Sequence, residues 1–445
     1  MRQPGKFNEN ENDHHGGRKG FQNQRCRFYI PKPMIRIGTK PVLEYGIEAL
    51  KDQGFTDIII TVSHLGQTIM DYFGDGRDFG VHIQYFIEKQ PLGSGGALFR
   101  LRDMLTEDFL LLNADVVFHV DLNRFMDYHC RKGGLVTLFA HPNSHPYDSS
   151  ILVTDENGAV QSWLSKEDAR PLWYRNCVNA GLHIINPAAL DLAGVAPETA
   201  EETTEGKPMR VDLDRQILRQ LCGTGKMFCY QSPEYVKDMG TPDRYEAVCR
   251  DFFSGKVHAR DLRKKQKAIF LDRDGTINQY AGFLRKIEDF ELLPGVAEAV
   301  KSINESDYLA IVVTNQPVIA RGEVTWEQLK EIHNKMETLL GQKGAWLDAI
   351  YCCPHHPQKG FRGEIPELKR DCDCRKPKPG MLLRAAEEYH LDLSQSWMIG
   401  DQENDVKAGK AAGCRTALIG TEEYGQDITS PTLLDAVKQI FSNRL

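Results

Sequence analysis

An apolar segment that ends in two aspartates one residue apart constrains this chain more than any other feature. Residues 268–271 are apolar, and Asp272 and Asp274 follow them just before a Gly-Thr turn. Alternate residues of a strand point to the same side, so both carboxylates can face one ligand at a strand end. One carboxylate can attack phosphorus, and the other can transfer protons. The alternative interpretation is a strand that ends in an ordinary polar turn.

Three later segments bring further polar groups to the ends of apolar runs. They are Thr314 and Asn315 after the run 311–313, Arg375 and Lys376 further on, and Asp401 with Asp405 after the run 397–399. The hydroxyl and amide suit phosphate oxygens, and the cations suit phosphate charge. Carboxylates beside a phosphate also suit Mg²⁺, a hard cation that binds a few carboxylates together with substrate.

In this order, the four segments resemble those of the haloacid dehalogenase-like phosphatases. The resemblance implies that Asp272 is the nucleophile and that Asp274 is the acid and base. It implies phosphate binding by Thr314, Asn315, Arg375 and Lys376, and Mg²⁺ binding by Asp272, Asp274 and Asp401.

Two close pairs of metal-binding residue types lie between these segments. Cys353 and His355 form one pair, and Cys372 and Cys374 form the other. Three thiols and one imidazole are a standard closed set for structural Zn²⁺, whereas a catalytic zinc usually keeps an open position. The alternatives are free cysteines beside a surface histidine, or a set that uses the adjacent Cys352 or His356 instead.

A zinc loop of this kind is similar to that of two groups of dehalogenase-like phosphatases. One group acts on D-glycero-D-manno-heptose 1,7-bisphosphate at the 7-phosphate, and the other acts on histidinol phosphate. The stretches 351–357, 372–381 and 319–322 look more like the heptose group. The stretch Gln316-Pro317-Val318 stands where a small Ser-Gly pair is expected, and Gln402 stands where a Lys is familiar.

Composition restricts the class of protein. The chain has 445 residues, a formal net charge of −7 and eleven cysteines. The acidic balance argues against a nucleic-acid partner. The cysteines without a secretory leader indicate a cytoplasmic protein with reduced thiols. No apolar run reaches the roughly 18 residues that a membrane span needs.

The length predicts two domains with a boundary between them. A basic, weakly apolar stretch at 252–266 precedes the first aspartate segment and is expected to be a linker. The expected division is an aberrant N-terminus at 1–29, a first domain at 30–251, and a phosphatase domain at 267–445. Strand and helix signals alternate in both domains, which predicts an α/β fold with two doubly wound, mostly parallel sheets.

The first domain contains a series of short motifs that, as a set, resembles the sugar-1-phosphate nucleotidyltransferases. The motifs lie at 30–34, 91–98, 113–115, 179–181 and 238–242. The resemblance implies a second Mg²⁺ at Asp115 and Asp238, and nucleotide or sugar contacts by Lys32, Gly93, Gly95, Gly96, Asn179 and Lys166. Ser165 stands where many relatives have Glu. The alternative is a domain that is retained only for packing.

The beginning of the chain departs from that family. Its members start with a strand and a Gly-rich loop that cradles the triphosphate, but residues 10–22 contain neither. Shifting their codons forward by one nucleotide allows Met-Lys-Thr-Ile-Ile-Met-Ala-Gly-Gly-Lys-Gly-Ser-Arg, which is such a strand and loop. We therefore expect a frameshift within residues 1 to about 27 and, in the chain as printed, a disabled nucleotide site.

Together, these resemblances imply two consecutive reactions on one chain. The phosphatase would remove the 7-phosphate of heptose 1,7-bisphosphate, and the transferase would join the remaining sugar 1-phosphate to GTP or another NTP. Histidinol phosphate and another small sugar phosphate remain alternative phosphatase substrates. Mg²⁺ and Zn²⁺ are the expected cofactors.

Overall fold

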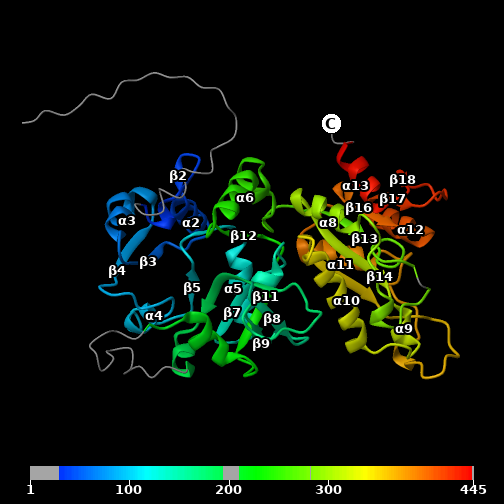
Figure 1. The fold of residues 1–445 in the computed structure, drawn as a ribbon, viewed down its shortest axis with the longest axis horizontal. Helices are drawn as coiled ribbons and strands as arrows, with labels where there is room; N and C mark the ends of the chain where they lie inside the picture. The colour runs from blue at the N-terminus through cyan, green and yellow to red at the C-terminus, as the bar shows by residue number, and fades with distance from the viewer. Residues whose placement is uncertain (1–29, 194–209, 281, 443–445) are drawn as a thin grey trace, which may run out of the picture.

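A computed structural model describes residues 30–193, 210–280 and 282–442. Figure 1 shows two α/β domains side by side, with the transferase-like domain on the left and the phosphatase-like domain on the right. The expected aberrant N-terminus at 1–29 lies outside the described residues. Within the described ranges, no helix is long and apolar enough to cross a membrane.

The larger sheet of the first domain is mixed. Its strands follow the order β11-β7-β10-β8-β9, and β5 also pairs with β10. Their bounds are β5 Phe109–Leu112, β7 Val136–His141, β8 Ile151–Thr154, β9 Val160–Leu164, β10 Val178–Ile185 and β11 Met227–Gln231. Helix α5 (Leu122–Lys132) begins where the Asp121 side chain accepts a hydrogen bond from the Arg124 amide, which satisfies a free donor of the first turn.

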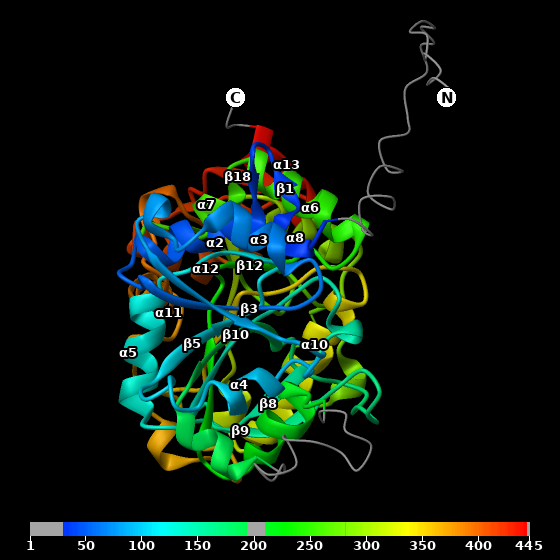
Figure 2. The ribbon, with the colours of Figure 1, turned by 90° about the vertical axis from the view of Figure 1, so that its left-hand side faces the viewer.

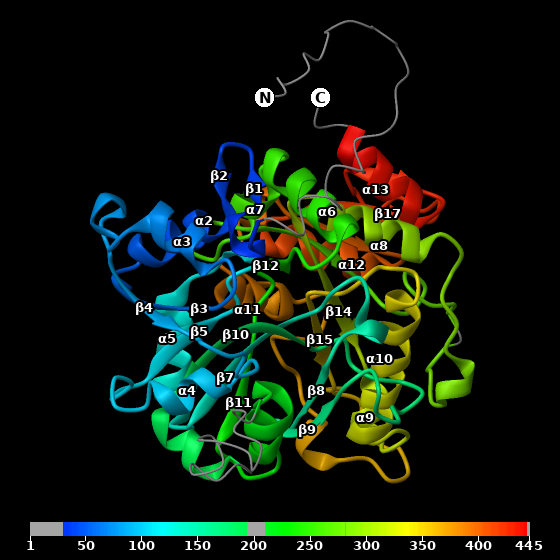
Figure 3. The same ribbon diagram turned by 60° about the vertical axis from the view of Figure 1, so that its left-hand side comes forward.

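A separate parallel pair, β3 (Asp57–Val62) and β4 (His82–Ile87), packs against α2 (Val42–Lys51) and α3 (Gly66–Phe73). Among the described strands, β3 pairs only with β4, and β5 pairs only with β10. Yet Ile58 of β3 and Leu110 of β5 pack against the same buried cluster, and both strands lie on one side of the domain (Figures 2 and 3). The sheet of this domain is thus interrupted between β3 and β5.

Another two-stranded sheet, this one antiparallel, joins β6 (Val116–His119) to β12 (Tyr235–Asp238), with Asp238 opposite Val116. Helices α6 (Pro242–Phe253) and α7 (Lys256–Ala259) follow β12 and lead toward the second domain. The short elements β1 (Arg36–Ile37), β2 (Lys40–Pro41) and α4 (Gly96–Arg100) complete the domain's described strands and α-helices.

The second domain is built on one fully parallel sheet in the order β15-β14-β13-β16-β17-β18. The strands are β13 Lys267–Leu271, β14 Tyr308–Asn315, β15 Ala349–Cys353, β16 Trp397–Gly400, β17 Arg415–Ile419 and β18 Ile428–Ser430. Helices α8 (Val296–Glu305), α10 (Trp326–Gly341) and α13 (Leu433–Ser442) share one buried cluster with the sheet. Helices α11 (Gly380–Tyr389) and α12 (Glu403–Ala412) share another, so the sheet is covered on both faces. The doubly wound, parallel architecture expected for the second domain is confirmed.

The first domain packs against the amino ends of these parallel strands. Arg260 donates from Nη1 to Asp348, just before β15, at 3.0 Å, and from Nη2 to the carbonyl of Tyr308, which begins β14, at 2.8 Å. The Thr338 hydroxyl accepts a hydrogen bond from the backbone N–H of Tyr174 and donates one to the Tyr174 carbonyl. The stretch expected as a linker thus includes α7 and the buried Arg260. The carboxyl ends of the strands, where Asp272 lies, are at the other edge of the sheet.

Candidate active site and metal centre

Asp272 and Asp274 follow β13, as the strand–turn pattern predicts. The strand is buried, and the Asp272 amide donates to the carbonyl of Ile399 in neighbouring β16 at 2.9 Å. The turn needs glycine at position 275 because φ is +88° there and a Cβ would lie 2.2 Å from Oδ2 of Asp401. The tight turn therefore brings the chain after β13 against the end of β16.

Three carboxylates gather at these strand ends. One oxygen each of Asp272, Asp401 and Asp405 lies within 4.8 Å of the others, an arrangement that can hold a metal ion. Lys376 lies between two of them, with Nζ 2.5 Å from Asp272 and 2.6 Å from Asp405. The buried Oδ1 of Asp401 has no hydrogen-bond partner. A hard divalent cation fits this oxygen-rich cluster.

The electrostatics of the cluster favour an additional positive charge. Burial, reinforced by the Asp405 carboxylate, raises the pKa of Asp272 to about 7 against the opposing effect of Lys376. Burial and Asp405 also raise the pKa of Asp401 to about 6. Burial lowers the pKa of Lys376, but Asp272 and Asp405 outweigh it and raise that pKa above its usual value. Lys376 is therefore a permanent cation beside carboxylates that repel one another.

Asp274 lies in a different set of contacts. Both oxygens of its carboxylate accept a hydrogen bond from Nη2 of Arg273 at 2.8 Å. In addition, the Asn278 side chain donates to Oδ1 at 3.0 Å, and the Gln316 side chain donates to Oδ2 at 2.8 Å. Burial raises the pKa of Asp274, but the Arg273 guanidinium and these donors hold it below its ordinary value. The three-carboxylate cluster does not include Asp274.

The predicted phosphate-binding residues lie around the same strand ends. Thr314, at the end of β14, is buried, and its hydroxyl accepts from Gln316 at 2.9 Å. Asn315 bonds the backbone of Lys376 twice, through Nδ2 to the carbonyl at 3.0 Å and through Oδ1 to the amide at 3.1 Å. Arg375 donates to the carbonyl of His355 at 3.1 Å. Asn315 thus orients Lys376, and Arg375 bonds the cysteine-histidine loop.

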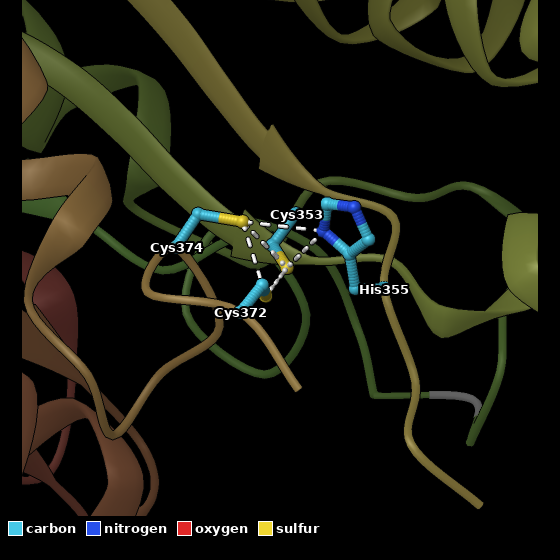
Figure 4. Close-up of side chains that lie close together, drawn as sticks. All are labelled: Cys353, His355, Cys372 and Cys374. Atoms are coloured by element: carbon cyan, nitrogen blue, oxygen red, sulfur yellow. Dashed lines mark hydrogen bonds between the residues drawn. The ribbon is translucent and has the colours of Figure 1, made fainter. Parts of the chain in front are cut away.

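The cysteine-histidine loop brings its four predicted ligands together (Figure 4). The Sγ atoms of Cys353, Cys372 and Cys374 lie 3.2–3.5 Å from one another, and His355 Nδ1 lies 3.4 Å from Cys374 and 3.7 Å from Cys353. Ligands about 2.3 Å from a tetrahedral zinc would be about 3.8 Å apart. These four residues can therefore hold a metal ion.

The adjacent alternatives have other contacts. His356 lies 3.2 Å from a guanidinium nitrogen of Arg321, and Cys352 is outside the metal-binding group. Cys374 is two residues before Lys376, so the cysteine-histidine site and the carboxylate site share one short segment of chain.

In the first domain, the pairing of β6 and β12 brings the backbones of Asp115 and Asp238 close. The Met239 amide donates to the Asp115 carbonyl at 3.2 Å. Each side chain has its own cation: Asp115 lies 3.6 Å from Lys32, and Arg244 donates to both oxygens of Asp238 at 3.0 Å. Asp115 directly precedes β6 and Asp238 ends β12, so the two acids are neighbours in the backbone while their carboxylates contact different cations.

The predicted Gly-rich loop packs against its own chain. A Cβ at Gly93 would lie 2.4 Å from the carbonyl oxygen of Val211, and one at Gly95 would lie 2.9 Å from Ile217. A Cβ at Gly96 would lie 2.8 Å from that of Leu92. Gly93 and Gly95 therefore allow the close approach of the segment that begins at residue 211, which the sequence pattern does not reveal, whereas Gly96 allows a tight turn against Leu92.

The other predicted sugar contacts lie near one cavity of about 420 Å³. Asn179 and Asp238 line it, and Asn179 Oδ1 is 3.2 Å from Nε2 of His183. Lys166 lies 3.3 Å from Asp148, which also lines the cavity, but Lys166 itself lines a smaller neighbouring hollow.

Sequence reasoning assigned no role to three residues that shape the phosphatase site. Asp405 had a signal, because it stands only four residues after Asp401, and the structure places it in the first turn of α12 beside the strand end. Gln316 and Asn278 had none, since their amides reach Asp274 only through the fold.

The two domains match different families of known proteins. A nucleotidyl transferase family model matches residues 28–253, and a HAD-hydrolase-like model matches residues 373–437. The chain is 43% identical over 158 residues to D-glycero-beta-D-manno-heptose-1,7-bisphosphate 7-phosphatase of Salmonella typhi. The matched region covers 36% of this chain and 82% of that protein.

Two solved structures resemble separate parts of the chain. D,D-heptose 1.7-bisphosphate phosphatase from B. bronchiseptica, complexed with magnesium and phosphate, is 32% identical and covers 40% of this chain and 99% of its own, with a TM-score of 0.36. HddC from Yersinia pseudotuberculosis is 23% identical and covers 50% of this chain and 90% of its own, with a TM-score of 0.41.

The fold and the strand-end cluster define a HAD-like phosphoric monoester hydrolase fused to a nucleotidyl transferase domain. The chain belongs to the nucleotidyl transferase family through residues 28–253, and to the heptose-1,7-bisphosphate 7-phosphatase family through its second domain. Both family resemblances seen in the sequence are thereby confirmed.

Proposed function

We propose that the second domain hydrolyses the 7-phosphate of D-glycero-D-manno-heptose 1,7-bisphosphate. The observation that carries the proposal is the meeting of Asp272, Lys376, Asp401 and Asp405 at the carboxyl ends of parallel strands. In the proposal, Asp272 is the nucleophile, Lys376 is the cation that faces the phosphate, and the carboxylates are the metal-binding set. The named activity of relatives over 40% identical supplies the substrate.

The proposed reaction has two steps. Oδ of Asp272 attacks phosphorus, the bond from phosphorus to the C7 oxygen breaks, and Asp274 gives that oxygen a proton. Water then attacks the aspartyl-phosphate, Asp274 takes a proton from it, and inorganic phosphate leaves with Asp272 restored. Lys376 and the Thr314 hydroxyl neutralise and orient the phosphoryl oxygens during both steps.

We propose that Mg²⁺ occupies the carboxylate site. Asp272 and Asp401 would hold it together with Asp405 of the same cluster, whereas the carboxylate of Asp274, which the sequence also predicts as a ligand, lies outside that cluster. When bound, the ion would neutralise phosphoryl charge. The unpartnered Oδ1 of Asp401 supports this assignment.

We propose that the cysteine-histidine site holds structural Zn²⁺. Four protein ligands leave no open position for chemistry. The site would instead fix the loop that carries Arg375 and Lys376. Because the thiols must stay reduced, a cytoplasmic location suits this chain.

We further propose that the first domain is built for the next reaction, which joins heptose 1-phosphate to GTP or another NTP. The cavity lined by Asn179 and Asp238 supports a sugar-phosphate site there. The nucleotide loop expected in this family falls in residues 1–29, outside the described residues. Transfer activity of the chain as printed therefore depends on its N-terminus.

Phosphate release by the purified chain tests the phosphatase proposal. Both anomers of heptose 1,7-bisphosphate are compared with histidinol phosphate in the presence of Mg²⁺. We expect a strong preference for the bisphosphate, with heptose 1-phosphate as product, and loss of turnover in Asp272→Asn with an unchanged fold. Preference for histidinol phosphate would move the chain to that activity, and wild-type turnover by Asp272→Asn would refute the nucleophile.

A further inference from the structure

The cavity of the first domain extends to the second domain. One part is lined by Asn179, Gly181 and Asp238, which belong to the expected transferase site. The other part, here called the interdomain lobe, lies where the domains meet. The lobe is formed by Lys237, Asp251, Lys256 and Arg260 of the first domain and its connection, and by Trp346 and Asp348 of the phosphatase domain.

Charged groups in the lobe are paired and largely removed from solvent. Asp251 lies 3.2 Å from Lys237 and 3.6 Å from Lys256, whose side chain is only 11% exposed. Arg260 and Asp348 form a 3.0 Å ion pair that is almost wholly buried. Such pairs hold their side chains in fixed positions, so their remaining hydrogen-bonding atoms are already oriented.

The phosphatase domain contributes an aromatic ring and a carboxylate to the lobe. Trp346 donates to Asp348 at 3.3 Å, and the Lys256 ammonium lies 5.9 Å from the centroid of the Trp346 ring. The buried Nε of Arg260 has no hydrogen-bond partner. The lobe therefore combines an aromatic face with an unused donor.

The charge of the lobe is close to balanced. Its three cations, Lys237, Lys256 and Arg260, face Asp251 and Asp348, and Glu234 also lines the cavity. At most one net positive charge remains in the lobe, so it would not offset the two negative charges of a phosphate dianion. A hydroxyl group, by contrast, can donate to a carboxylate and accept from an ammonium at once. The lobe thus suits neutral hydroxyl groups better than a phosphate.

We propose that the interdomain lobe binds the hydroxylated tail of the sugar 1-phosphate used by the first domain. The phosphatase domain would then complete the acceptor site of its neighbour. This inference rests on the proposed transferase function. Asp238, an expected Mg²⁺ ligand of the transferase, marks the reacting end of the site, and β12 runs from it about 10 Å back to Tyr235 at roughly 3.3 Å per residue. That length suits a seven-carbon sugar.

The proposal implies an order for the two reactions. A sugar that still carries the tail phosphate would place that dianion against Asp251 and Asp348, so the lobe accepts the sugar after hydrolysis. The phosphatase site lies at the carboxyl ends of its strands, whereas Trp346 and Asp348 lie at the amino ends. The product must therefore leave one edge of the domain and bind at the other.

Binding to the full-length chain tests the proposal directly. D-glycero-D-manno-heptose 1-phosphate and mannose 1-phosphate, which lacks the seventh carbon, are titrated by calorimetry. We expect the heptose to bind about tenfold more tightly. Lys256→Met should remove that tenfold preference, whereas Lys265→Met, at an exposed position outside the cavity, should keep it. No heptose binding, equal binding of both sugars, or an unchanged Lys256→Met would overturn the proposal.

The fluorescence of Trp346 reports the lobe separately from the phosphatase site. Heptose 1-phosphate should change the emission of Asp272→Asn, and adding Trp346→Phe should remove that change. Heptose 1,7-bisphosphate should leave the emission unchanged at the same concentration, and an equal response to both sugars would refute the preference for a free tail. Phosphate release measured on the Lys256→Met and Lys265→Met chains should equal wild type. If the wild-type chain also released no phosphate, the phosphatase proposal would be refuted, but the binding result would stand.

Discussion

The Lys376 ammonium lies 2.5 Å from the carboxylate of Asp272, although 104 residues separate them in the chain. The contact exists because Asp272 directly follows β13, while Asn315 at the end of adjacent β14 forms hydrogen bonds with both the amide and the carbonyl of Lys376. The cation is thus fixed by the sheet on one side and by the cysteine-histidine loop on the other. A phosphate at Asp272 would meet a charge that is already in place.

Replacing this cation should remove most of the phosphatase activity. In Lys376→Met the side chain keeps its length but loses its charge, and kcat/KM should fall by about 10²-fold or more because charge stabilisation dominates such reactions. Lys378→Met is the matched control, since Lys378 pairs with exposed Asp371 at the surface. Steady-state phosphate release measures both. Comparable losses in the two variants would show that Lys376 does not act on the phosphate.

A methyl group at Gly275 should disable the carboxylate site. The Cβ of Gly275→Ala would lie 2.2 Å from Asp401 Oδ2, so Asp401 must move away from Asp272. The Mg²⁺ concentration for half-maximal phosphate release should rise by about tenfold or more. Gly413→Ala separates this effect from backbone strain, because Gly413 has a similar φ of +85° and open space around it. Equal Mg²⁺ dependence in both variants would contradict the metal assignment.

The parts of the site that the sequence predicted are those encoded by local pattern. Apolar runs that end in Asp, Thr or Gly-Asp place their polar residues at one sheet edge, so the meeting of Asp272, Thr314 and Asp401 follows from topology. Gln316 and Asn278 were missed because any polar residue at their positions fits the local pattern. The Gly93 loop is a motif whose local contacts could not be predicted. Its glycines leave room for the segment that begins at Val211, which is distant in the sequence.

Removing one thiol should release the metal from the cysteine-histidine site. Elemental analysis should find about one zinc per wild-type chain and almost none in Cys372→Ser. Phosphatase activity should also fall, because Cys374 is two residues from Lys376 and the loop would lose its anchor. Exposed Cys130→Ser should retain both zinc and activity. Full zinc content in Cys372→Ser would exclude that thiol from the ligand set.

The domain interface should weaken as pH rises. Burial raises the pKa of Glu337 from 4.5 to about 7. The Glu337 carboxylate accepts a hydrogen bond from the backbone N–H of Asn176, in the other domain, at 3.4 Å. The folded state therefore binds this proton more tightly than the unfolded state, so the contribution of Glu337 to stability falls between about pH 4.5 and 7. Its full size is at most about 3 kcal/mol. Glu337→Gln should remove this part of the pH dependence in urea unfolding, and an unaltered profile would contradict it.

Correcting the reading frame should complete the sheet of the first domain. β3 and β5 each pair with a single described strand although both pack against one cluster, and the shifted codons of residues 10–22 allow an apolar strand with a Gly-rich loop. A chain carrying that alternative reading should bind GTP or another NTP, and its Tm should rise by about 2–4 °C per kcal/mol gained. The chain as printed is the control. Peptides that match residues 2–25 as printed, together with an unchanged genomic sequence, would refute a sequencing artefact. An unchanged Tm would then refute the missing strand itself.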